Sequence, residues 1–429
     1  MSEVSRFDSQ DASNIKNQSH AFHARPTRDT NESGATQGGT AQGGTAQGGA
    51  TQGGAGTNGD GNSGAVGFAG GGSGGHISPG IAIAERLAAR APHMKSVFLC
   101  STRAIDADML RQAGAIAQAM PASPPSLKHA LKFVRNFLAA KKRATQVMRE
   151  YDIRHIVSLG GFVTVPVVLA AKKLGIPVTL LNLDATPGKA NRFVQSRATH
   201  VLSAVVANDL ARWDGNALGF PVRHSAVAPA NARQCREQLG LEADRFTLLV
   251  TGASQGAASL NQFVPHFAAR NKDLFTNWQV LHLAGGNALD AAQLRSDYAR
   301  AGVKAVVLAF QHQMGLAWGA ADLALTRAGA NSVAEVEINN VPAVFVPYPF
   351  HRDLHQKANA QPLVDAGAAA MALDKLDRDF NMQSIGVVLE KLMADGGARS
   401  AMHSALVAMP KRDAADRVAQ LVLADLKHR

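Results

Sequence analysis

The stretch that most constrains the fold is a glycine loop set between an apolar run and a helical pattern. Residues 65–69 are apolar, five of the six residues from Gly70 to Gly75 are glycine, and Pro79 is expected to open a helix that runs to about Ala91. Glycine allows positive φ angles and close approach of a ligand, and a helix start presents unpaired N–H groups with a partial positive charge. The sequence therefore predicts a strand, a turn and a helix that suit a phosphate or a tightly held sugar.

Two interpretations of this loop stay open on its residues alone. Gly70, Gly72 and Gly75 fit the G-x-G-x-x-G pattern of dinucleotide sites. The next strand, expected at 96–100, ends in Ser101-Thr102-Arg103, which lacks an acid for the ribose of NAD but suits the 2′-phosphate of NADP. His76, at the mouth of the loop, favours proton transfer instead, because a pyrophosphate cradle needs no imidazole. A structural or solvent-facing histidine is the plainer interpretation.

Composition narrows the class of protein. The 429 residues suffice for about two domains, and no apolar run reaches the ~18 residues of a membrane span, so a soluble or peripheral protein is expected. Cys100 and Cys235 lie far apart, which indicates neither a disulfide framework nor a zinc site. A formal charge of +11 favours an anionic partner. With 5% aromatic residues and no interleaving of basic and aromatic residues, nucleic acid is not expected.

The first 64 residues read as a flexible tail. A five-residue period of Gln-Gly-Gly runs from Gln37 to Gly54, and such a polar repeat cannot bury a core. No basic start followed by an apolar stretch precedes Ala65, so a secretory signal is not expected. The sequence predicts a disordered tail over residues 1–64.

The rest of the chain alternates short β-rich runs with helical segments in two series. Strands are expected at 65–69, 96–100, 153–158, 178–183 and 200–205, and then at 246–251, 279–284, 305–309, 322–326 and 342–347. Such alternation predicts two parallel sheets, and ligands of parallel sheets bind beyond the carboxyl ends of the strands. In the second series a small-residue loop, 251–257, again precedes a helix and offers a second anion site.

The segment from Leu127 to Arg149 has seven basic residues and no acid, with apolar residues at three- and four-residue spacing. The basic residues are Lys128, Lys132, Arg135, Lys141, Lys142, Arg143 and Arg149. One interpretation is an interfacial helix for anionic lipid. The other is a surface helix whose apolar stripe packs on the sheet and whose basic face is solvated.

Two later positions also carry paired interpretations. Glu335 follows a glycine loop at a helix start, where a carboxylate either complements the helix dipole or accepts both hydroxyls of a ribose. His355 and Gln356 are either a polar pair at a helix start or groups that reach a sugar.

Taken together, these motifs resemble the MurG-type family of glycosyltransferases over about Ala65 to Ala370. Residues 70–80 are similar to its GGTGGHxxPG loop with Ser73 in place of Thr, Gly160-Gly161-Phe162 to its GGY, and 220–223 to its NPVR. Residues 254–257 with Asn261 are similar to GGSQGAxxxN. Arg327 to Ala330 with Glu335, and His355-Gln356 with Asn359-Ala360, are similar to its donor signature.

The resemblance implies a GT-B fold: two Rossmann-like α/β domains, with the acceptor on the first and UDP-N-acetylglucosamine on the second. By the same resemblance Ser254, Gln255 and Gly256 bind the diphosphate, Glu335 the ribose, His355 and Gln356 the sugar, and uracil rests near Gln311. The remaining donor-side residues implied are Ser73, Gly74, Gly75, Arg223 and Asn261. His76 is the candidate general base, and the enzyme is expected to invert the anomeric centre without a metal or other cofactor.

The departures from the family lie on the acceptor side. The family's HEQN reads Leu181-Asn182-Leu183-Asp184, so Asn182 replaces the acid and Asp184 is the nearest carboxylate to supply it. Phe162 lacks the tyrosine hydroxyl, whereas Asn191 matches.

The expected reaction is N-acetylglucosamine transfer to undecaprenyl-pyrophosphoryl-muramoyl-pentapeptide in peptidoglycan synthesis, by a peripheral enzyme on the cytoplasmic face of the membrane. Alternatives are a GT-B enzyme with another acceptor, an NADP-dependent oxidoreductase and a noncatalytic nucleotide-sugar-binding protein. The expected domains are 65–223 for acceptor and membrane, 224–410 for UDP-sugar, and a C-terminal helix, 411–429, that packs back on the first.

Overall fold

The computed structural model describes residues 64–71, 74–124, 129–208, 210–252, 256–286, 288–349 and 355–427. The tail expected over residues 1–64 therefore lies, up to residue 63, outside the described residues. The same holds for Ser73, Lys128, Ser254 and Gln255.

The first sheet has six parallel strands in the order β3-β2-β1-β4-β5-β6. They are β1 (Ala65–Ala69), β2 (Lys95–Cys100), β3 (Ile116–Ala119), β4 (Ile153–Ser158), β5 (Val178–Asn182) and β6 (His200–Ser203). β1 and β5 are buried along their whole length, because helices cover both faces of the sheet. The five expected strands are present, and β3 is an additional edge strand.

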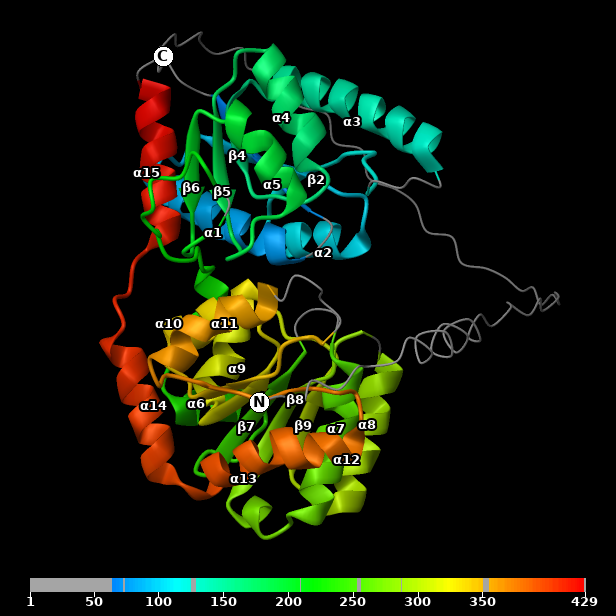
Figure 1. Ribbon diagram of the computed structural model, residues 1–429, viewed down its shortest axis with the longest axis vertical. Coiled ribbons are helices and arrows are strands. Elements are labelled where there is room, and N and C mark those ends of the chain that lie inside the picture. The colour runs from blue at the N-terminus through cyan, green and yellow to red at the C-terminus, as the bar shows by residue number, and fades with distance from the viewer. Residues whose placement is uncertain are drawn as a thin grey trace, which may run out of the picture. The chain divides into compact units, whose positions relative to one another are not determined.

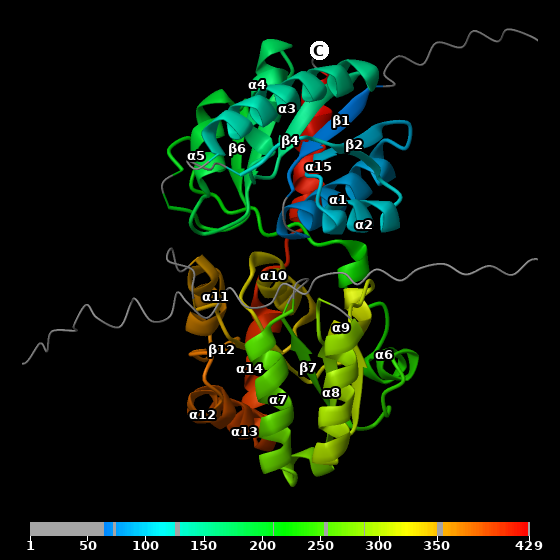
Figure 2. The ribbon, with the colours of Figure 1, turned by 90° about the vertical axis from the view of Figure 1, so that its right-hand side faces the viewer.

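Helices pack on both faces of this sheet (Figures 1 and 2). They are α1 (Gly74–Arg90), α2 (Ala104–Gln112), α3 (Ala130–Glu150), α4 (Thr164–Lys173), α5 (Lys189–Val194) and α15 (Ala414–Lys427), with a short 3₁₀ turn, η2 (Gln195–Arg197). One core cluster joins β1 and β2 to α1 and α15, and another joins the opposite face to α3 and α4. The C-terminal helix α15 thus packs against the first sheet.

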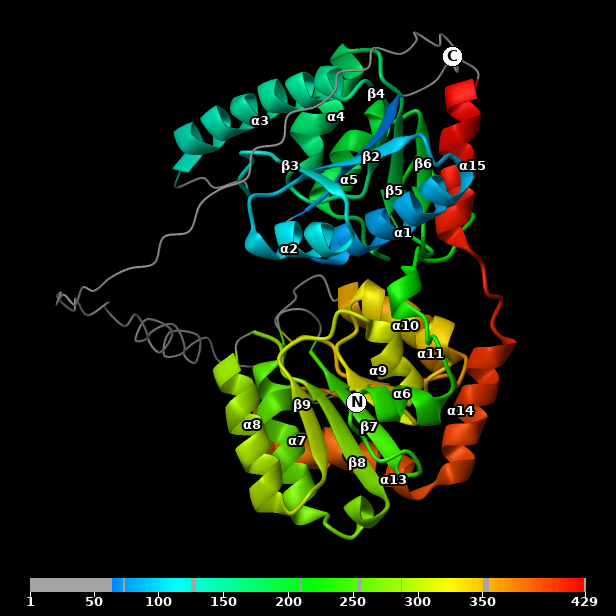
Figure 3. The same ribbon diagram turned by 180° about the vertical axis from the view of Figure 1, so that it is seen from behind.

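The second sheet repeats the same topology in the order β12-β11-β10-β7-β8-β9, all parallel (Figure 3). Its strands are β7 (Phe246–Thr251), β8 (Trp278–Leu283), β9 (Ala305–Leu308), β10 (Leu323–Thr326), β11 (Ala343–Phe345) and β12 (Ala370–Met371). The five strands expected here are present within two residues at each end, and β12 is an additional two-residue edge strand.

The helices of this half flank the second sheet. They are α6 (Ala232–Gln238), α7 (Ala258–Arg270), α8 (Ala288–Ala301), α9 (Met314–Ala320), α10 (Ala330–Asn339), α11 (His355–Asp365), α12 (Arg378–Asn381), α13 (Val387–Ala394) and α14 (Gly396–Ala408), with the short turns η3 (His224–Ala226), η4 (Leu274–Thr276) and η5 (Met382–Gly386). Two core clusters cover its two faces. No helix in the described ranges is long and apolar enough to cross a bilayer.

Helix α1 begins earlier than expected. Pro79 was expected to open it, but the helix starts at Gly74 and Pro79 lies inside. Proline has no N–H to donate to the carbonyl four residues back, which is that of Gly75. The Gly75 carbonyl instead accepts a hydrogen bond from Asn331 Nδ2 of α10, at 3.4 Å. The interior proline therefore leaves open a backbone acceptor that a helix of the second sheet uses.

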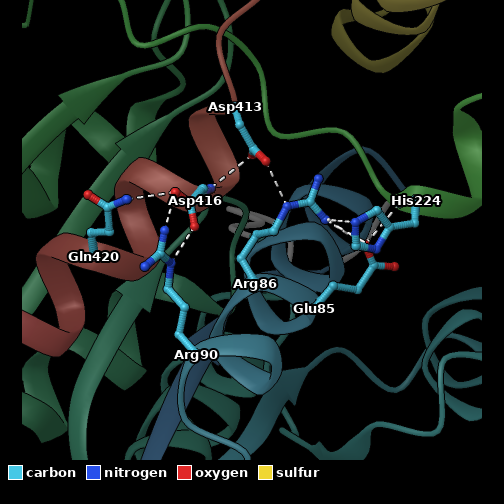
Figure 4. A network of polar contacts seen from close by, with 7 residues as sticks. All are labelled: Glu85, Arg86, Arg90, His224, Asp413, Asp416 and Gln420. Atoms are coloured by element: carbon cyan, nitrogen blue, oxygen red, sulfur yellow. Dashed lines mark hydrogen bonds and ion pairs between the residues drawn. The ribbon is translucent and has the colours of Figure 1, made fainter.

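The chain crosses from one sheet to the other twice, and residues of α1 contact both of these passages (Figure 4). Arg86 Nη1 lies 2.5 Å from Nε2 of His224, on the first passage, and Arg86 Nε donates to Asp413, on the second, at 2.8 Å. The His224 backbone N–H donates to Glu85, one residue before Arg86. Arg86 therefore holds both passages against α1, the helix that starts at the glycine loop.

A second pair of charges fixes α15 on α1. Arg90 donates from Nε and Nη2 to the two carboxylate oxygens of Asp416, at 2.5 and 2.7 Å. Gln420 donates to the same carboxylate (Figure 4). Such two-point pairing of guanidinium and carboxylate fixes orientation as well as distance.

Candidate active site

Each sheet has one point at which the strand order reverses, and the strands at these two points lead into the helices that carry His76 and Glu335. In the first sheet β1 lies between β2 and β4, and in the second β7 lies between β8 and β10. His76 lies in the first turn of α1, the helix that follows β1, and Glu335 lies in α10, the helix that follows β10. Ligands of open parallel sheets bind at this reversal, beyond the carboxyl ends of the strands.

His76 lies in the first turn of α1, half-buried, against the loop after β4. Gly160 and Gly161 have φ angles of +103° and +81°, which L residues with side chains rarely adopt. A Cβ on Gly160 would lie 3.3 Å from His76 Nε2 and 3.1 Å from Asn191 Oδ1, and one on Gly161 would lie 2.5 Å from the Gly71 carbonyl oxygen. The paired glycines therefore let the imidazole approach the backbone of this loop.

The charge on His76 depends on opposing effects. Burial lowers the pKa of the imidazole, while the carboxylates of Asp184 and Asp106 and a hydrogen bond to the Gly71 backbone act to raise it. The net shift in pKa is downward, so the ring is neutral at neutral pH. A neutral imidazole flanked by carboxylates can accept a proton, as a general base must.

The polar residues after β5 form one network. Asn182 is fully buried and donates both amide hydrogens, to the Asp184 carbonyl at 2.7 Å and to Ser203 Oγ at 3.0 Å. Its Oδ1 accepts from Asn191 Nδ2 at 3.1 Å. Both amide hydrogens of Asn182 are thus used and hold the turn in place. Asn191 Oδ1 is buried, and in the described part of the chain no group hydrogen-bonds to it. Phe162 packs partly against the apolar core of this half.

Asp184 reaches across to the second half of the chain. Asn359, in α11, donates from Nδ2 to Asp184 Oδ1 and accepts from the Ala185 backbone N–H, each at 3.2 Å. Asn359 is buried, so the amide is held in place. The helix that begins with His355 and Gln356 is thereby joined to the loop that faces His76.

Glu335 is buried in α10 at 8% exposure and is oriented by Trp318. The indole Nε1 donates to Glu335 Oε2 at 2.8 Å. Burial raises the pKa of this carboxyl, and the positive charge of Arg223 and the Trp318 hydrogen bond oppose the rise. Arg223 Nε is itself buried and has no hydrogen-bond partner among the residues that the structure describes. The structure therefore brings together Arg223 and Glu335, two of the residues expected on the donor side.

A buried relay of hydrogen bonds joins α8, β8 and α7. Tyr298 lies 2.7 Å from His282 Nδ1, and His282 Nε2 lies 3.1 Å from Asn261 Oδ1. Asn261 Nδ2 donates to the Ala284 carbonyl. Because Asn261 Oδ1 only accepts, His282 carries its proton on Nε2 and accepts from the tyrosine hydroxyl. Burial depresses the pKa of His282 to about 3, which keeps the ring neutral.

The same hydrogen bonds lie next to Gly256, one of the residues expected to bind the diphosphate. Gly256 has a φ of +71°, and a Cβ there would lie 2.3 Å from the Ala284 carbonyl oxygen that Asn261 binds. Asn261 thus fixes the carbonyl against which Gly256 packs. Ser254 and Gln255, expected in the same loop, lie outside the described residues.

The other expected donor residues have local contacts. Gln356 Oε1 accepts from the Tyr348 backbone N–H at 2.9 Å, and Gln311 Oε1 accepts from that of Gln313 at 3.1 Å. His355 starts α11, half-buried. Gly74 and Gly75 form the first turn of α1.

The position considered for the 2′-phosphate of NADP is occupied by an acid. Ser101 donates to the buried carboxylate of Asp106 at 2.6 Å and accepts from the Arg103 N–H at 3.3 Å. A buried carboxylate at this point disfavours a phosphate.

Three groups of the site were not found from the sequence. Trp318 lies 17 residues before Glu335 and carries no motif, and Asn359 was noted only as part of a signature. His282 belongs to a strand that reads as an ordinary buried strand. One feature of the sequence hinted at this part of the site: Asp184 departs from the family's motif.

Comparison with known proteins agrees with this geometry. Residues 66–203 match the description "Glycosyltransferase family 28 N-terminal domain" and residues 247–418 match "Glycosyltransferase family 28 C-terminal domain". The fold is shared with MurG of Acinetobacter baumannii, at a TM-score of 0.63, 24% identity and coverage of 84% of this chain and 99% of that one. It is shared also with MnaA of S. aureus in complex with UDP, at a TM-score of 0.59, 11% identity and 85% and 97% coverage.

Several relatives in sequence carry the same name. The UDP-N-acetylglucosamine–N-acetylmuramyl-(pentapeptide) pyrophosphoryl-undecaprenol N-acetylglucosamine transferase of Nocardioides sp. is 35% identical, over 83% of this chain and 96% of its own length. The protein of that name from Desulforudis audaxviator is 32% identical, over 82% and 96%. The chain has both halves of a GT-B fold and both family 28 domains, and it is 32–35% identical to these relatives over nearly their whole length. The chain therefore belongs to the MurG family of glycosyltransferases.

Proposed function

We propose that the protein transfers N-acetylglucosamine from UDP-N-acetylglucosamine to undecaprenyl-pyrophosphoryl-muramoyl-pentapeptide, with inversion at the anomeric carbon. Relatives that carry this activity in their names, at up to 35% identity over 96% of their length, support the substrates. The observation that carries the chemistry is the Asp184–Asn359 contact, because it joins the loop facing His76 to the start of α11, where the donor sugar is expected.

The proposed roles follow from the chemistry of each group. His76, neutral at neutral pH, takes the proton of the acceptor hydroxyl as its oxygen attacks the anomeric carbon. Glu335 accepts hydrogen bonds from the ribose. The loop ending at Gly256 and the start of α7 stabilise the departing diphosphate through N–H groups, without a metal ion. Chelation of divalent cations is accordingly expected to leave the rate unchanged.

The donor is tested by titrating the protein with UDP, UDP-N-acetylglucosamine and NADP in a calorimeter. Binding of the two uridine nucleotides without NADP is the expected result, because Asp106 occupies the place of a 2′-phosphate. NADP binding that excludes UDP would contradict the proposal. Transfer is then measured with lipid-linked muramoyl-pentapeptide and with simple soluble sugars. Product formed only from the soluble sugars would favour another acceptor.

We also propose that the first half of α3 binds an anionic membrane surface. Leu131, Val134 and Leu138 are 89%, 52% and 59% exposed, on the same half of the helix as the exposed Lys132 and Arg135. The buried residues of α3, from Ala140 to Met148, all lie in its second half. The apolar residues of the first half are thus available to a lipid boundary, and the cations to lipid head groups.

This part of the proposal is tested on vesicles with and without acidic lipid. Replacing Lys132 and Arg135 of the first half of α3, together with the exposed Lys142 that follows that half, by Gln is expected to weaken binding to acidic vesicles. Added salt is expected to weaken binding of the parent protein. The matched control replaces the exposed Lys272, Lys375 and Lys391 of the second half, which removes the same charge. Equal losses in both variants would show that only net charge matters.

A further inference from the structure

The helices α1 and α10 hold neighbouring residues of the first passage between the sheets. Glu85, in the second half of α1, accepts the backbone N–H of His224 at 2.9 Å (Figure 4). Asn339, the last residue of α10, donates to the Ala226 carbonyl at 2.9 Å and accepts from the Ala228 backbone N–H at 2.7 Å. The two helices are therefore joined, away from their starts, through one short segment of chain.

The same helices meet directly at their starts. Asn331, in the first turn of α10, donates from Nδ2 to the carbonyl of Gly75, in the first turn of α1, at 3.4 Å. Gly75 directly precedes His76, and Asn331 lies about one helical turn before Glu335. One hydrogen bond thus connects the turn that carries the candidate base with the helix that carries the candidate ribose ligand.

Pro79 makes the Gly75 carbonyl available to Asn331. In an uninterrupted helix this carbonyl would accept the N–H of residue 79, but a proline has no N–H to donate. A proline ring also crowds the carbonyl four residues back, which tilts away from the helix axis. The Asn331 amide binds the carbonyl that is left open in this way, and it does so without placing a charge beside His76.

We propose that Asn331 is a positioning residue, which sets the distance between His76 and the donor by holding the first turn of α1 against α10. This inference rests on the proposed function. The Asp184–Asn359 contact joins other elements, the turn after β5 and α11, so it does not hold the start of α1 in place. Without the Asn331 bond the first turn of α1 is free to move away from α10, whereas transfer needs reacting atoms about 3–3.5 Å apart.

The first test measures the distance between the two halves of the full chain by pulsed EPR with UDP added. Spin labels are attached to Lys172→Cys in α4 and Lys391→Cys in α13, because both lysines are exposed, whereas Cys100 and Cys235 are buried and react slowly. Asn331→Ala is expected to broaden the distribution of distances relative to the parent, since one of the ties between the halves is lost. An unchanged distribution overturns the inference.

The second test measures kcat and UDP affinity separately. Asn331→Ala is expected to lower kcat by about 3- to 10-fold, the scale of one hydrogen bond between uncharged groups. UDP affinity should stay near the parent value, because UDP is expected to bind the second half alone. Asn331→Asp should lose at least as much kcat, since an ionised carboxylate has no N–H to donate. A variant that loses UDP affinity and keeps kcat overturns the inference.

The matched control is Asn271→Ala. Asn271 Nδ2 donates to the Phe267 carbonyl at 2.9 Å, so this variant also removes an amide-to-carbonyl bond at a helix end, but within the second half. It is expected to lower the melting temperature and to keep the parent values of kcat and of the distance distribution. Equal losses of kcat in Asn271→Ala and Asn331→Ala would overturn the positioning role.

A double-mutant cycle tests whether Pro79 and Asn331 act through the same carbonyl. In Pro79→Ala the new N–H of residue 79 lets the Gly75 carbonyl return to its bond within α1. Asn331→Ala is therefore expected to cost little further kcat in the Pro79→Ala background. Residues that share one bond give such non-additive losses, whereas independent residues give additive ones. The same 3- to 10-fold loss in both backgrounds would contradict the proposal.

The inference and the proposed function fail in different ways. The EPR comparison needs no turnover, so a parent protein that fails to transfer the sugar refutes the proposed function and leaves the tie between Asn331 and Gly75 measurable. A parent that transfers the sugar, with an Asn331→Ala variant of unchanged kcat and unchanged distances, refutes only the role of Asn331.

Discussion

The indole Nε1 of Trp318 donates a hydrogen bond to Oε2 of Glu335, at 2.8 Å, with Trp318 1% exposed and Glu335 8% exposed. The bond fixes the rotation of a carboxylate that is expected to bind the donor ribose. It also leaves the opposite oxygen available to a ligand. A buried tryptophan thus sets the geometry of a polar site.

Trp318→Phe is expected to weaken UDP-N-acetylglucosamine binding by about 10-fold, since a hydrogen bond to a charged group contributes about 1.5 kcal/mol or more. The kcat at saturating donor should stay near the parent value. Trp278→Phe is the control, because Trp278 is 3% exposed in β8 and its truncation leaves a comparable cavity away from Glu335. Equal losses of affinity in both variants would reduce Trp318 to a packing residue. Calorimetry measures both.

Donor affinity is expected to fall as the pH is lowered, through Glu335. Burial raises the pKa of this carboxyl, so it takes up a proton at higher pH than an exposed glutamate, and the neutral acid is a weaker acceptor. UDP-N-acetylglucosamine suits the measurement because its diphosphate diester does not titrate near neutrality. Glu335→Gln should bind about 10- to 100-fold more weakly at neutral pH, with the pH dependence removed. A variant that keeps the parent's pH dependence would assign it to another group.

Gly160→Ala is expected to lower kcat by about 10²-fold. Its Cβ would lie 3.3 Å from His76 Nε2, at a φ of +103°, and small displacements of reacting groups cost this much. Gly175→Ala has the same kind of backbone strain, at a φ of +70°, but nothing lies within 4 Å of its Cβ. It should lower the melting temperature and leave kcat unchanged. A Gly160→Ala enzyme with parent kcat would show that the imidazole does not need this space.

His282 should make the protein less stable in acid. Its pKa falls from 6.5 to about 3 on folding, so below pH 6.5 the unfolded chain takes up a proton that the folded chain refuses until about pH 3. Above pH 6.5 His282 does not lower the free energy of unfolding. At pH 5 it lowers this free energy by about 2 kcal/mol. Urea unfolding at several pH values measures it. His282→Gln should flatten this part of the pH dependence, whereas the exposed His403→Gln should not.

The strands and their parallel order were predictable because buried runs such as Leu248 to Thr251 read clearly as strands. The two missed strands are edges: β3 is only half-buried, and β12 has two residues. The start of α1 was misplaced because Pro79 was taken as a helix opener, whereas Asn331 satisfies the carbonyl that it leaves without a partner. Local sequence does not encode a partner 256 residues away.

The family motifs named candidate site residues, but they did not show how these residues are held. In the sequence, Asn182 stood only for a missing acid. In the structure its amide group is hydrogen-bonded to Ser203 and Asn191, and these partners could not be identified from the sequence because they adjoin Asn182 only in the fold. The link from Asp184 to Asn359 joins residues 175 positions apart. Motif spacing is blind to contacts of this kind, since packing of distant elements creates them.

The central claim is that His76 is the base of N-acetylglucosamine transfer. The most direct test is kcat for transfer from UDP-N-acetylglucosamine to lipid-linked muramoyl-pentapeptide, measured for the parent and His76→Ala beside UDP affinity and melting temperature. If His76 is the base, the parent turns over and kcat is about 10²- to 10⁴-fold lower in His76→Ala, with UDP affinity near the parent value. A His76→Ala enzyme that turns over at nearly the parent rate would contradict it.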